Sequence, residues 1–453
     1  MKKIFYFIIL ILSLINFSYG KNNLTIDIDS SEVKKIHLVF EKINSIDGNS
    51  DSRALTNKVF TTVENNLLTT NLFLIQNSGD SVFDDYESVK NLSSIDLANL
   101  VISKYNRKSV DAILSGFVET KNNGEIELKI RLWDILDQRE LFAKYYVIDK
   151  SNTKRVGDII SDIIYELLTG ESSGHFDTKI IYVSETGPAR ERKKRITICD
   201  FDGSNSAYIT NGENLVLTPI FSKFNKGEII YLEYQGDNKP HLFKYNLVNN
   251  KLEMIGNMKE MTFAPNFNPS GLNEIIFSAT NNNGESNIFK LDFNEKKIKQ
   301  LTFDSAIDTV PSYSPDGQNI VFVSDKTGIR KLYMMDKDGE NVKLISNGRG
   351  VYDKPSWSPD GKLISFVKIY NGEFSVGLMT PDGENERSII SAYLVEGVKW
   401  SPNGRYLIYS KQKSPFGKAS IPGIYTVDIL TGKEHKIPTP DSQGATDPDW
   451  IKK

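Results

Sequence analysis

The 453-residue sequence is poor in cysteine and histidine, the side chains that most often build disulfide frameworks and transition-metal sites. Cys199 is the only cysteine, which excludes an intrachain disulfide and any cysteine-based zinc cluster. The four histidines lie far apart, at His37, His175, His241 and His435. Basic and acidic residues nearly balance, 55 against 58, whereas a dedicated nucleic-acid-binding protein carries a strong basic excess. We therefore expect no metal, no cofactor and no nucleic acid.

Long apolar runs are also missing, apart from one at the N-terminus. Lys2 and Lys3 precede a nearly unbroken apolar run over residues 4–15, and small residues at Ser18 and Gly20 suit a signal peptidase. This run is too short to cross about 30 Å of hydrocarbon comfortably. We predict that residues 1–20 are a signal peptide, with an uncleaved anchor as the less favoured alternative. The mature chain is then exported and not inserted in a membrane.

An internal repeat occupies the C-terminal part of the sequence. Tyr313-Ser-Pro-Asp-Gly317, Trp357-Ser-Pro-Asp-Gly361 and Trp400-Ser-Pro-Asn-Gly404 are near-identical, and Phe267-Asn-Pro-Ser-Gly271 is a looser copy. The aromatic positions 221, 267, 313, 357, 400 and 450 recur at steps of 43 to 50 residues. Each copy is followed by short β-rich runs separated by turns. Such periods are typical of four-stranded propeller blades.

The last copy of the repeat is incomplete, since three more strands do not fit after Trp450. The missing strands are predicted at the start of the repeat region, over residues 179–183, 195–199 and 207–210. Building the last blade from both ends pairs strand edges that would otherwise be exposed. Residues 175–453 are therefore predicted to form an all-β six-bladed propeller.

Residues 21–169 lack the repeat and mix helical with strand patterns. Strands are predicted over residues 24–28, 36–40, 112–118 and 125–133, and helices over residues 52–68 and 95–105. Apolar residues at helical spacing from Val156 to Leu168 predict a further helix. Gly170 ends it, and residues 170–174 form a linker. The fold class is an α/β N-terminal domain followed by the propeller.

Two short motifs could carry chemistry. Residues 170–174 match G-x-S-x-G, but a nucleophile elbow follows a strand, and here a helix precedes, so we interpret the match as a linker. The run from Arg190 to Arg195 is the only dense basic segment. It is either a patch for nucleic acid or anionic lipid, or a solvated hairpin. We favour the hairpin, and its role stays open.

Taken together, the signal peptide, the small α/β domain and the propeller closed by both its ends resemble the TolB family of the Tol–Pal envelope system. The most specific stretches are Tyr165-Glu-Leu-Leu-Thr-Gly170, Gly174-His-Phe-Asp-Thr-Lys-Ile-Ile-Tyr-Val183 and Thr262-Phe-Ala-Pro265. The resemblance implies a monomeric, non-enzymatic periplasmic adaptor. It also implies a role in outer-membrane integrity and in envelope constriction at cell division.

The same resemblance implies two partners, the peptidoglycan-associated lipoprotein Pal and TolA. Pal is expected at the mouth of the propeller channel, on the segments that enter each innermost strand. Those residues are Leu217, Thr218, Met261, Thr262, Phe263, Ala264, Asp308, Thr309, Val310, Tyr352, Asp353, Glu396, Thr446 and Asp447. TolA is expected on the mature N-terminus, whose apolar and polar residues alternate as in an added edge strand. Those residues are Asn22, Asn23, Leu24, Thr25, Ile26, Asp27 and Ile28.

One alternative from a different class remains open. A secreted propeller hydrolase or lyase could act on a carbohydrate or peptide in the channel. Such an enzyme needs charged side chains gathered at the opening. Asp308, Asp353, Glu396 and Asp447 keep this alternative open.

Overall fold

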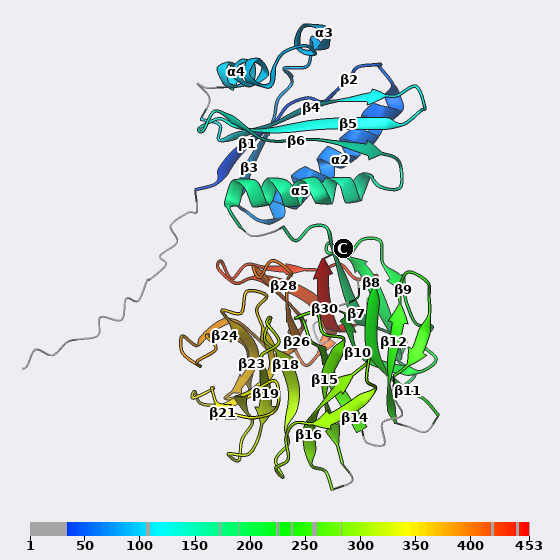
Figure 1. The fold of residues 1–453 in the computed structure, drawn as a ribbon, viewed down its shortest axis with the longest axis vertical. Coiled ribbons are helices and arrows are strands. Elements are labelled where there is room, and N and C mark those ends of the chain that lie inside the picture. The colour runs from blue at the N-terminus through cyan, green and yellow to red at the C-terminus, as the bar shows by residue number, and fades with distance from the viewer. Residues whose placement is uncertain are drawn as a thin grey trace, which may run out of the picture.

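The chain folds into a small α/β region followed by a six-bladed propeller, as the fold class predicted (Figure 1). The computed structural model describes residues 34–105, 109–171, 174–188, 190–222, 225, 227–236, 239–255, 261–281, 283–417, 421–440 and 444–452. The predicted signal peptide, residues 1–20, and the predicted strand over residues 24–28 lie outside these residues. No helix in the described ranges is long and apolar enough to cross a membrane.

The N-terminal region is built on a mixed sheet with the strand order β3-β1-β4-β5-β6, in which β2 also pairs with β4. β1 is parallel to both of its neighbours, and β4, β5 and β6 are antiparallel. The strands are β1 Ile36–Phe40, β2 Asn44–Ser45, β3 Phe73–Asn77, β4 Ala112–Thr120, β5 Ile126–Asp134 and β6 Arg139–Ile148.

Helices cover both faces of this sheet. They are α2 Ser50–Thr69, α3 Tyr86–Val89, α4 Ser94–Tyr105 and α5 Thr153–Thr169. α2 and α5 pack on the face that carries Leu128, Ile130 and Leu132, while α3 and α4 pack on the opposite face around Trp133. The apolar stripe of α5 explains its position, because that stripe is buried only against another apolar layer. Gly170 ends α5 with φ of 73°, a left-handed conformation that glycine adopts without strain.

The propeller consists of six four-stranded antiparallel sheets. The first complete blade consists of β10 Leu215–Phe221, β11 Glu228–Tyr234, β12 Pro240–Asn246 and β13 Leu252–Met254. The second consists of β14 Met261–Phe267, β15 Glu274–Thr280, β16 Ser286–Asp292 and β17 Lys297–Gln300. The third consists of β18 Thr309–Tyr313, β19 Asn319–Ser324, β20 Lys331–Asp336 and β21 Lys343–Leu344. The fourth consists of β22 Val351–Trp357, β23 Ile364–Tyr370, β24 Glu373–Met379 and β25 Arg387–Ala392. The fifth consists of β26 Leu394–Trp400, β27 Tyr406–Gln412, β28 Gly423–Asp428 and β29 Glu434–Lys436.

The sixth blade joins the two ends of the propeller sequence. Its strands are β30 Ala445–Lys452, β7 Thr178–Thr186, β8 Lys193–Asp200 and β9 Ala207–Tyr208, in that order. Trp450 lies opposite Ile180 in the ladder. Its indole N–H donates a hydrogen bond of 2.7 Å to the hydroxyl of Thr178. This buried polar contact fixes the register between the first and last strands.

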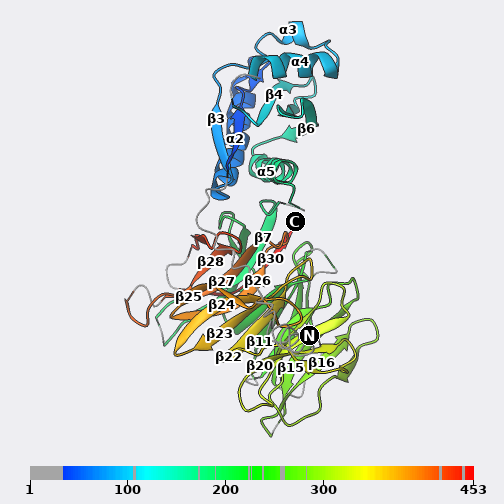
Figure 2. The same cartoon turned by 90° about the vertical axis from the view of Figure 1, so that its left-hand side faces the viewer.

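The N-terminal region and the propeller share one hydrophobic core at their junction. Ile164 and Tyr165 of α5 belong to the same cluster of buried residues as Phe176, Tyr406 and Trp450. Figure 1 shows the C-terminal end of β30 at this junction, and Figure 2 shows α5 above β7 and β30. A contiguous core of this kind holds the two parts in one arrangement.

The sequence patterns did not reveal β2, β3, α3 or β6. β6 is an edge strand, and Tyr145 and Val147 on it are exposed, so it lacks the alternation of a half-buried strand. β3 and α3 are too short for a periodic pattern to emerge. The helix of α5 and the strands β1, β4 and β5 lie where they were predicted, within a few residues.

Candidate functional site

The innermost strand of every blade breaks its pairing at the same place along the strand. In β18 the ladder with β19 shifts between Thr309 and Ser312, which leaves Val310 and Pro311 outside the regular pairing. β10, β14, β22, β26 and β30 carry the same shift. A β-bulge bends its strand and turns backbone away from the ladder. Six bulges therefore surround the channel at one level.

One residue of each bulge has a positive φ. These residues are Thr218, Ala264, Val310, Lys354, Gly397 and Asp447, with φ between 45° and 66°. Only Gly397 adopts this conformation freely, and a β-branched residue such as Val310 is strained there. Together with the prolines that follow five of them, they line a narrow cavity of about 70 Å³. Retained strain of this kind is typical of functional sites.

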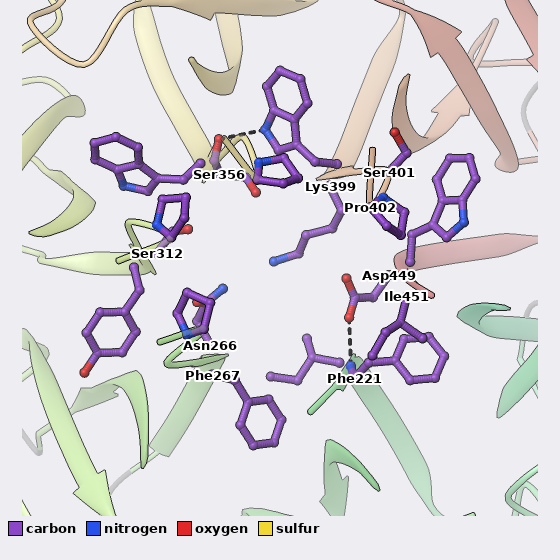
Figure 3. Close-up of a pocket in the computed structure, with 18 of the residues that line it drawn as sticks. Phe221, Asn266, Phe267, Ser312, Ser356, Lys399, Ser401, Pro402, Asp449 and Ile451 are labelled. Carbon is purple, nitrogen blue, oxygen red and sulfur yellow. Dashed lines mark hydrogen bonds between the residues drawn. The ribbon is translucent and has the colours of Figure 1, made fainter. Parts of the chain in front are cut away.

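Past the bulges, the channel widens into a cavity of about 450 Å³ (Figure 3). Its wall includes the residue that precedes the aromatic position in every repeat. These residues are Ile220, Asn266, Ser312, Ser356, Lys399 and Asp449. Figure 3 shows Lys399 and Asp449 projecting into the cavity from neighbouring strands, and Asp449 accepts the backbone N–H of Phe221 at 2.7 Å. Ile220, Asn266 and Lys399 line both cavities, so the channel is continuous.

The bulges mark the end of the channel that is remote from the N-terminal region. β30 runs from Ala445 to Lys452, and its C-terminal end lies at the junction (Figure 1). Asp447 near its start therefore lies toward the opposite face. We call the opening at this face the mouth, formed by the six bulge residues and the residues that lead into them.

Most of the residues predicted from the sequence do lie at the mouth with accessible surface. Glu396 is exposed. Half-buried are Leu217, Thr218, Phe263, Ala264, Val310, Asp353, Thr446 and Asp447. Met261 and Thr262 lie at the start of β14, and their side chains are outside the described part of the structure. The tertiary structure thus brings together residues that are up to 230 positions apart, from Leu217 to Asp447.

Three predicted residues are buried in the blades instead of exposed at the mouth. Asp308 and Tyr352 have no exposed surface, and Thr309 is 8% exposed. The Tyr352 hydroxyl donates a hydrogen bond of 2.7 Å to Glu386, and the ammonium groups of Lys331 and Lys368 lie 4.8 and 5.0 Å from the centroid of its ring. These side chains support the wall and are not available for direct contact. Asp308 and Tyr352 stand two residues before the positive-φ residue of their bulges, where Val216, Val395 and Ala445 are buried in other blades. The mostly apolar residues at this repeat position could have indicated its burial.

Asp308 is unusual among the six equivalent positions. The other blades carry Val216, Thr262, Tyr352, Val395 and Ala445 at this place, which are mostly apolar. Neither carboxylate oxygen of Asp308 has a hydrogen-bond partner of good geometry among the described residues. Burial raises the pKa of this carboxyl, although the nearby hydroxyls of Ser324 and Thr302 partly oppose the shift.

Carboxylates and basic side chains together give the accessible rim its electrostatic character. Partial desolvation and the neighbouring Asp447 raise the pKa of Glu396, and Lys354 opposes the shift. Asp353 accepts a hydrogen bond of 2.5 Å from Arg330. We call Asp353, Glu396 and Asp447 the acidic arc, since they belong to the consecutive inner strands β22, β26 and β30.

Two of the four carboxylates that kept the enzymatic alternative open are already engaged within the protein. Asp308 is buried and Asp353 is bound to Arg330. In the described ranges, no three His, Cys, Asp or Glu side chains gather as ligands for a metal ion. Within the G-x-S-x-G match, Glu171 instead binds Arg405, which lies 8% exposed at the junction. The mouth offers shape and charge, which suit binding.

Two groups of site residues were missed or cannot be placed. We did not predict Lys354 or the residues that project into the wider cavity. In five of the six repeats the latter lie between a proline and the aromatic residue, and this constant spacing could have indicated them. The predicted TolA-binding residues Asn22, Asn23, Leu24, Thr25, Ile26, Asp27 and Ile28 lie outside the described residues.

Comparison with known proteins agrees with this architecture. A sequence model described as the TolB beta propeller domain matches residues 165–453. TolB from Acinetobacter baumannii has a similar structure, with a TM-score of 0.75 and 21% identity over 92% of this chain and 96% of that chain. Hydrazine synthase from Kuenenia stuttgartiensis matches at a TM-score of 0.50 and 13% identity, over 60% of this chain and 46% of that chain. Since the family match covers more than half of the sequence, the chain belongs to the TolB beta-propeller family.

Proposed function

We propose that this chain is a periplasmic, non-enzymatic adaptor of the Tol–Pal system, which binds Pal at the mouth of the propeller channel. The observation that carries this proposal is the ring of six bulges, five of them at non-glycine residues with positive φ. A rigid opening loses little conformational freedom when a partner docks, so it favours protein binding. The role would support outer-membrane integrity and envelope constriction at cell division.

The proposed contact residues are those that keep accessible surface at the mouth. They are Leu217, Thr218, Phe263, Ala264, Val310, Asp353, Glu396, Thr446 and Asp447, with Met261 and Thr262 beside them on β14. Asp308, Thr309 and Tyr352 would act from within the wall by holding the bulges of β18 and β22. A few of these residues are expected to dominate the affinity.

Calorimetric titration of the chain from Lys21 to Lys453 with the soluble domain of Pal from the same organism tests this proposal. Ala264→Arg places a long side chain in the narrow cavity without changing the backbone requirement, because arginine and alanine both carry a Cβ. Val248→Arg is the matched control, since Val248 is 82% exposed in the turn between β12 and β13, at the opposite end of the blade.

We expect saturable binding by the unmodified protein and by Val248→Arg, and loss of binding by Ala264→Arg. Equal binding by both variants would show that the site lies elsewhere. Absence of binding by the unmodified protein would overturn the adaptor role and direct attention to carbohydrate or peptide substrates in the channel.

We further propose that residues 22–28 bind the C-terminal domain of TolA as an added strand. This proposal requires a signal peptide over residues 1–20 that is removed on export. It also rests on the boundaries 21–169 for the N-terminal domain, 170–174 for the linker and 175–453 for the propeller. Deleting residues 22–28 should abolish TolA binding while Pal binding persists. Retained TolA binding would place that contact on another surface.

A further inference from the structure

The hairpin between β7 and β8 carries the basic run whose role the sequence left open. From Glu185 to Arg195 the sequence has five basic side chains and two acidic ones, although the whole chain has a formal charge of −3. Arg190, Arg192 and Lys193 are exposed. A local excess of one charge on a short hairpin is a candidate for binding a surface of opposite charge.

Part of this charge is already neutralised within the blade. The Glu185 carboxylate forms salt bridges with Arg192, at 3.0 Å, and with Lys194, at 2.8 Å. Arg195 donates to the Asn211 carbonyl and the Thr186 hydroxyl, and it stacks over Tyr208. Arg190 and Lys193 form no salt bridge with any residue that the structure describes. These two cations are therefore free to face a partner.

The hairpin lies beside the mouth. Ala445 of β30 pairs with Ser184, and the next residue of β7, Glu185, donates its N–H to the Gly444 carbonyl at 2.9 Å. Asp447, the bulge residue, is only two positions beyond Ala445 in β30. Lys194 is also close enough to Glu396 to oppose the rise of its pKa. A partner seated on the mouth would therefore come within reach of the hairpin.

Opposite charges thus occupy neighbouring sectors of one face. The acidic arc of Asp353, Glu396 and Asp447 is contributed by β22, β26 and β30, and the basic hairpin by the strands next to β30. Asp353 of this arc is paired with Arg330, whereas Glu396 and Asp447 form no salt bridge among the described residues, and these two carboxylates would oppose the approach of an anionic membrane to the same face. A protein surface can present an acidic patch to the hairpin and a basic one to the arc, which fixes its rotation about the channel axis.

We infer that the β7–β8 hairpin is a second contact surface of the mouth, and that it binds an acidic patch on the protein that docks there. This inference rests on the proposed function. Because the cations are exposed and lie at the rim, their main effect is on the rate of association and on its salt dependence.

The test measures association rates with the soluble domain of Pal over a series of salt concentrations, by stopped-flow fluorescence. The variant is Arg190→Glu with Lys193→Glu, which breaks no salt bridge among the residues that the structure describes. The control is Lys58→Glu with Lys150→Glu, an identical charge change on exposed residues of the N-terminal region. Circular dichroism and thermal unfolding confirm that both double variants remain folded.

We expect the hairpin variant to associate about tenfold more slowly at low salt, with a flatter salt dependence, and the control to stay within about twofold of the unmodified protein. Equal rates for the two variants would overturn the inference while leaving Pal binding intact. No binding by the unmodified protein would instead overturn the proposed function.

Sedimentation with anionic phospholipid vesicles is measured in parallel. If the hairpin variant alone loses vesicle binding and keeps its association rate, the occupant is a membrane and the inference is wrong.

Discussion

Arg405 in the turn between β26 and β27 donates a hydrogen bond of 2.7 Å to the carboxylate of Glu171, which directly follows the cap of α5. The same guanidinium binds both carboxylate oxygens of Asp428, each at 2.9 Å. Arg405 and Asp428 are buried. One side chain thus joins the fifth complete blade to the end of the N-terminal region through charge-assisted hydrogen bonds.

Replacing Arg405 should destabilise the protein strongly. Arg405→Met leaves Asp428 buried without its main counter-charge, and removing one partner of a buried pair costs about 3 to 5 kcal/mol. Glu171→Gln is the matched control, because its side chain is 28% exposed and its loss should cost less than about 1 kcal/mol. Urea unfolding followed by tryptophan fluorescence compares the two. Similar losses for both variants would contradict the central role of the Asp428 pair.

Removing the buried carboxyl of Asp308 should stabilise the protein near neutral pH. Asp308→Val introduces the side chain found at the equivalent positions 216 and 395. The gain should be about 1 to 3 kcal/mol, because an unpartnered buried polar group is lost. Since burial raises the folded-state pKa, the unmodified protein gains stability from this group as the pH falls toward that pKa. The advantage of the variant should therefore shrink in acid, which thermal unfolding across pH measures. The exposed Asp80→Val, in the N-terminal region, serves as the control and should change little.

The ring of bulges predicts unequal effects when glycine and valine are exchanged at two equivalent positions. Gly397→Val introduces a β-branched residue at φ of 66°, and its Cβ would meet the Pro448 ring at 3.0 Å. We expect a loss of about 2 kcal/mol or more. Val310→Gly relieves the strain at φ of 50° but also removes a half-buried side chain, so its effect should be within about 1 kcal/mol of zero. Calorimetric unfolding distinguishes them. A Gly397→Val protein as stable as the original would show that the bulges are not strained.

His175 predicts a pH dependence at the junction. Its ring lies among Phe176, Tyr406 and Tyr165, and burial, with a contribution from Arg405, lowers its pKa to about 3. A histidine that is neutral when folded but titrates near its ordinary value when unfolded stabilises the fold above about pH 6.5. That contribution is lost progressively as the pH falls, by about 2 kcal/mol at pH 5.

His175→Phe should abolish this component, so the difference in unfolding free energy between the two proteins should change between pH 7 and pH 5. Urea titrations at both values measure it. A difference independent of pH would show that His175 is already protonated, or accessible to water, in the folded state.

The sequence by itself determined the number of blades and their order. The turn motif repeats at a nearly constant period, and each copy needs the next one to bury its apolar face, so six copies fix a propeller. The apolar stripe of α5 and the alternation in β5 likewise follow from local periodicity, which no distant contact overrides. The mouth could be located for the same reason, because equivalent positions of a repeat reach the same end of the channel.

Only the tertiary structure decided which mouth residues face outward. Thr309 and Glu396 occupy the same place in their bulges, directly before the positive-φ residue, yet Thr309 is buried and Glu396 is exposed. The segments that pack beside each strand decide this difference, and the repeat does not encode them. The contact of Arg405 with Glu171, 234 positions apart, and the place of the basic hairpin beside the acidic arc also follow from closure of the ring. These relationships join distant parts of the chain, and distant pairings leave no trace in local sequence patterns.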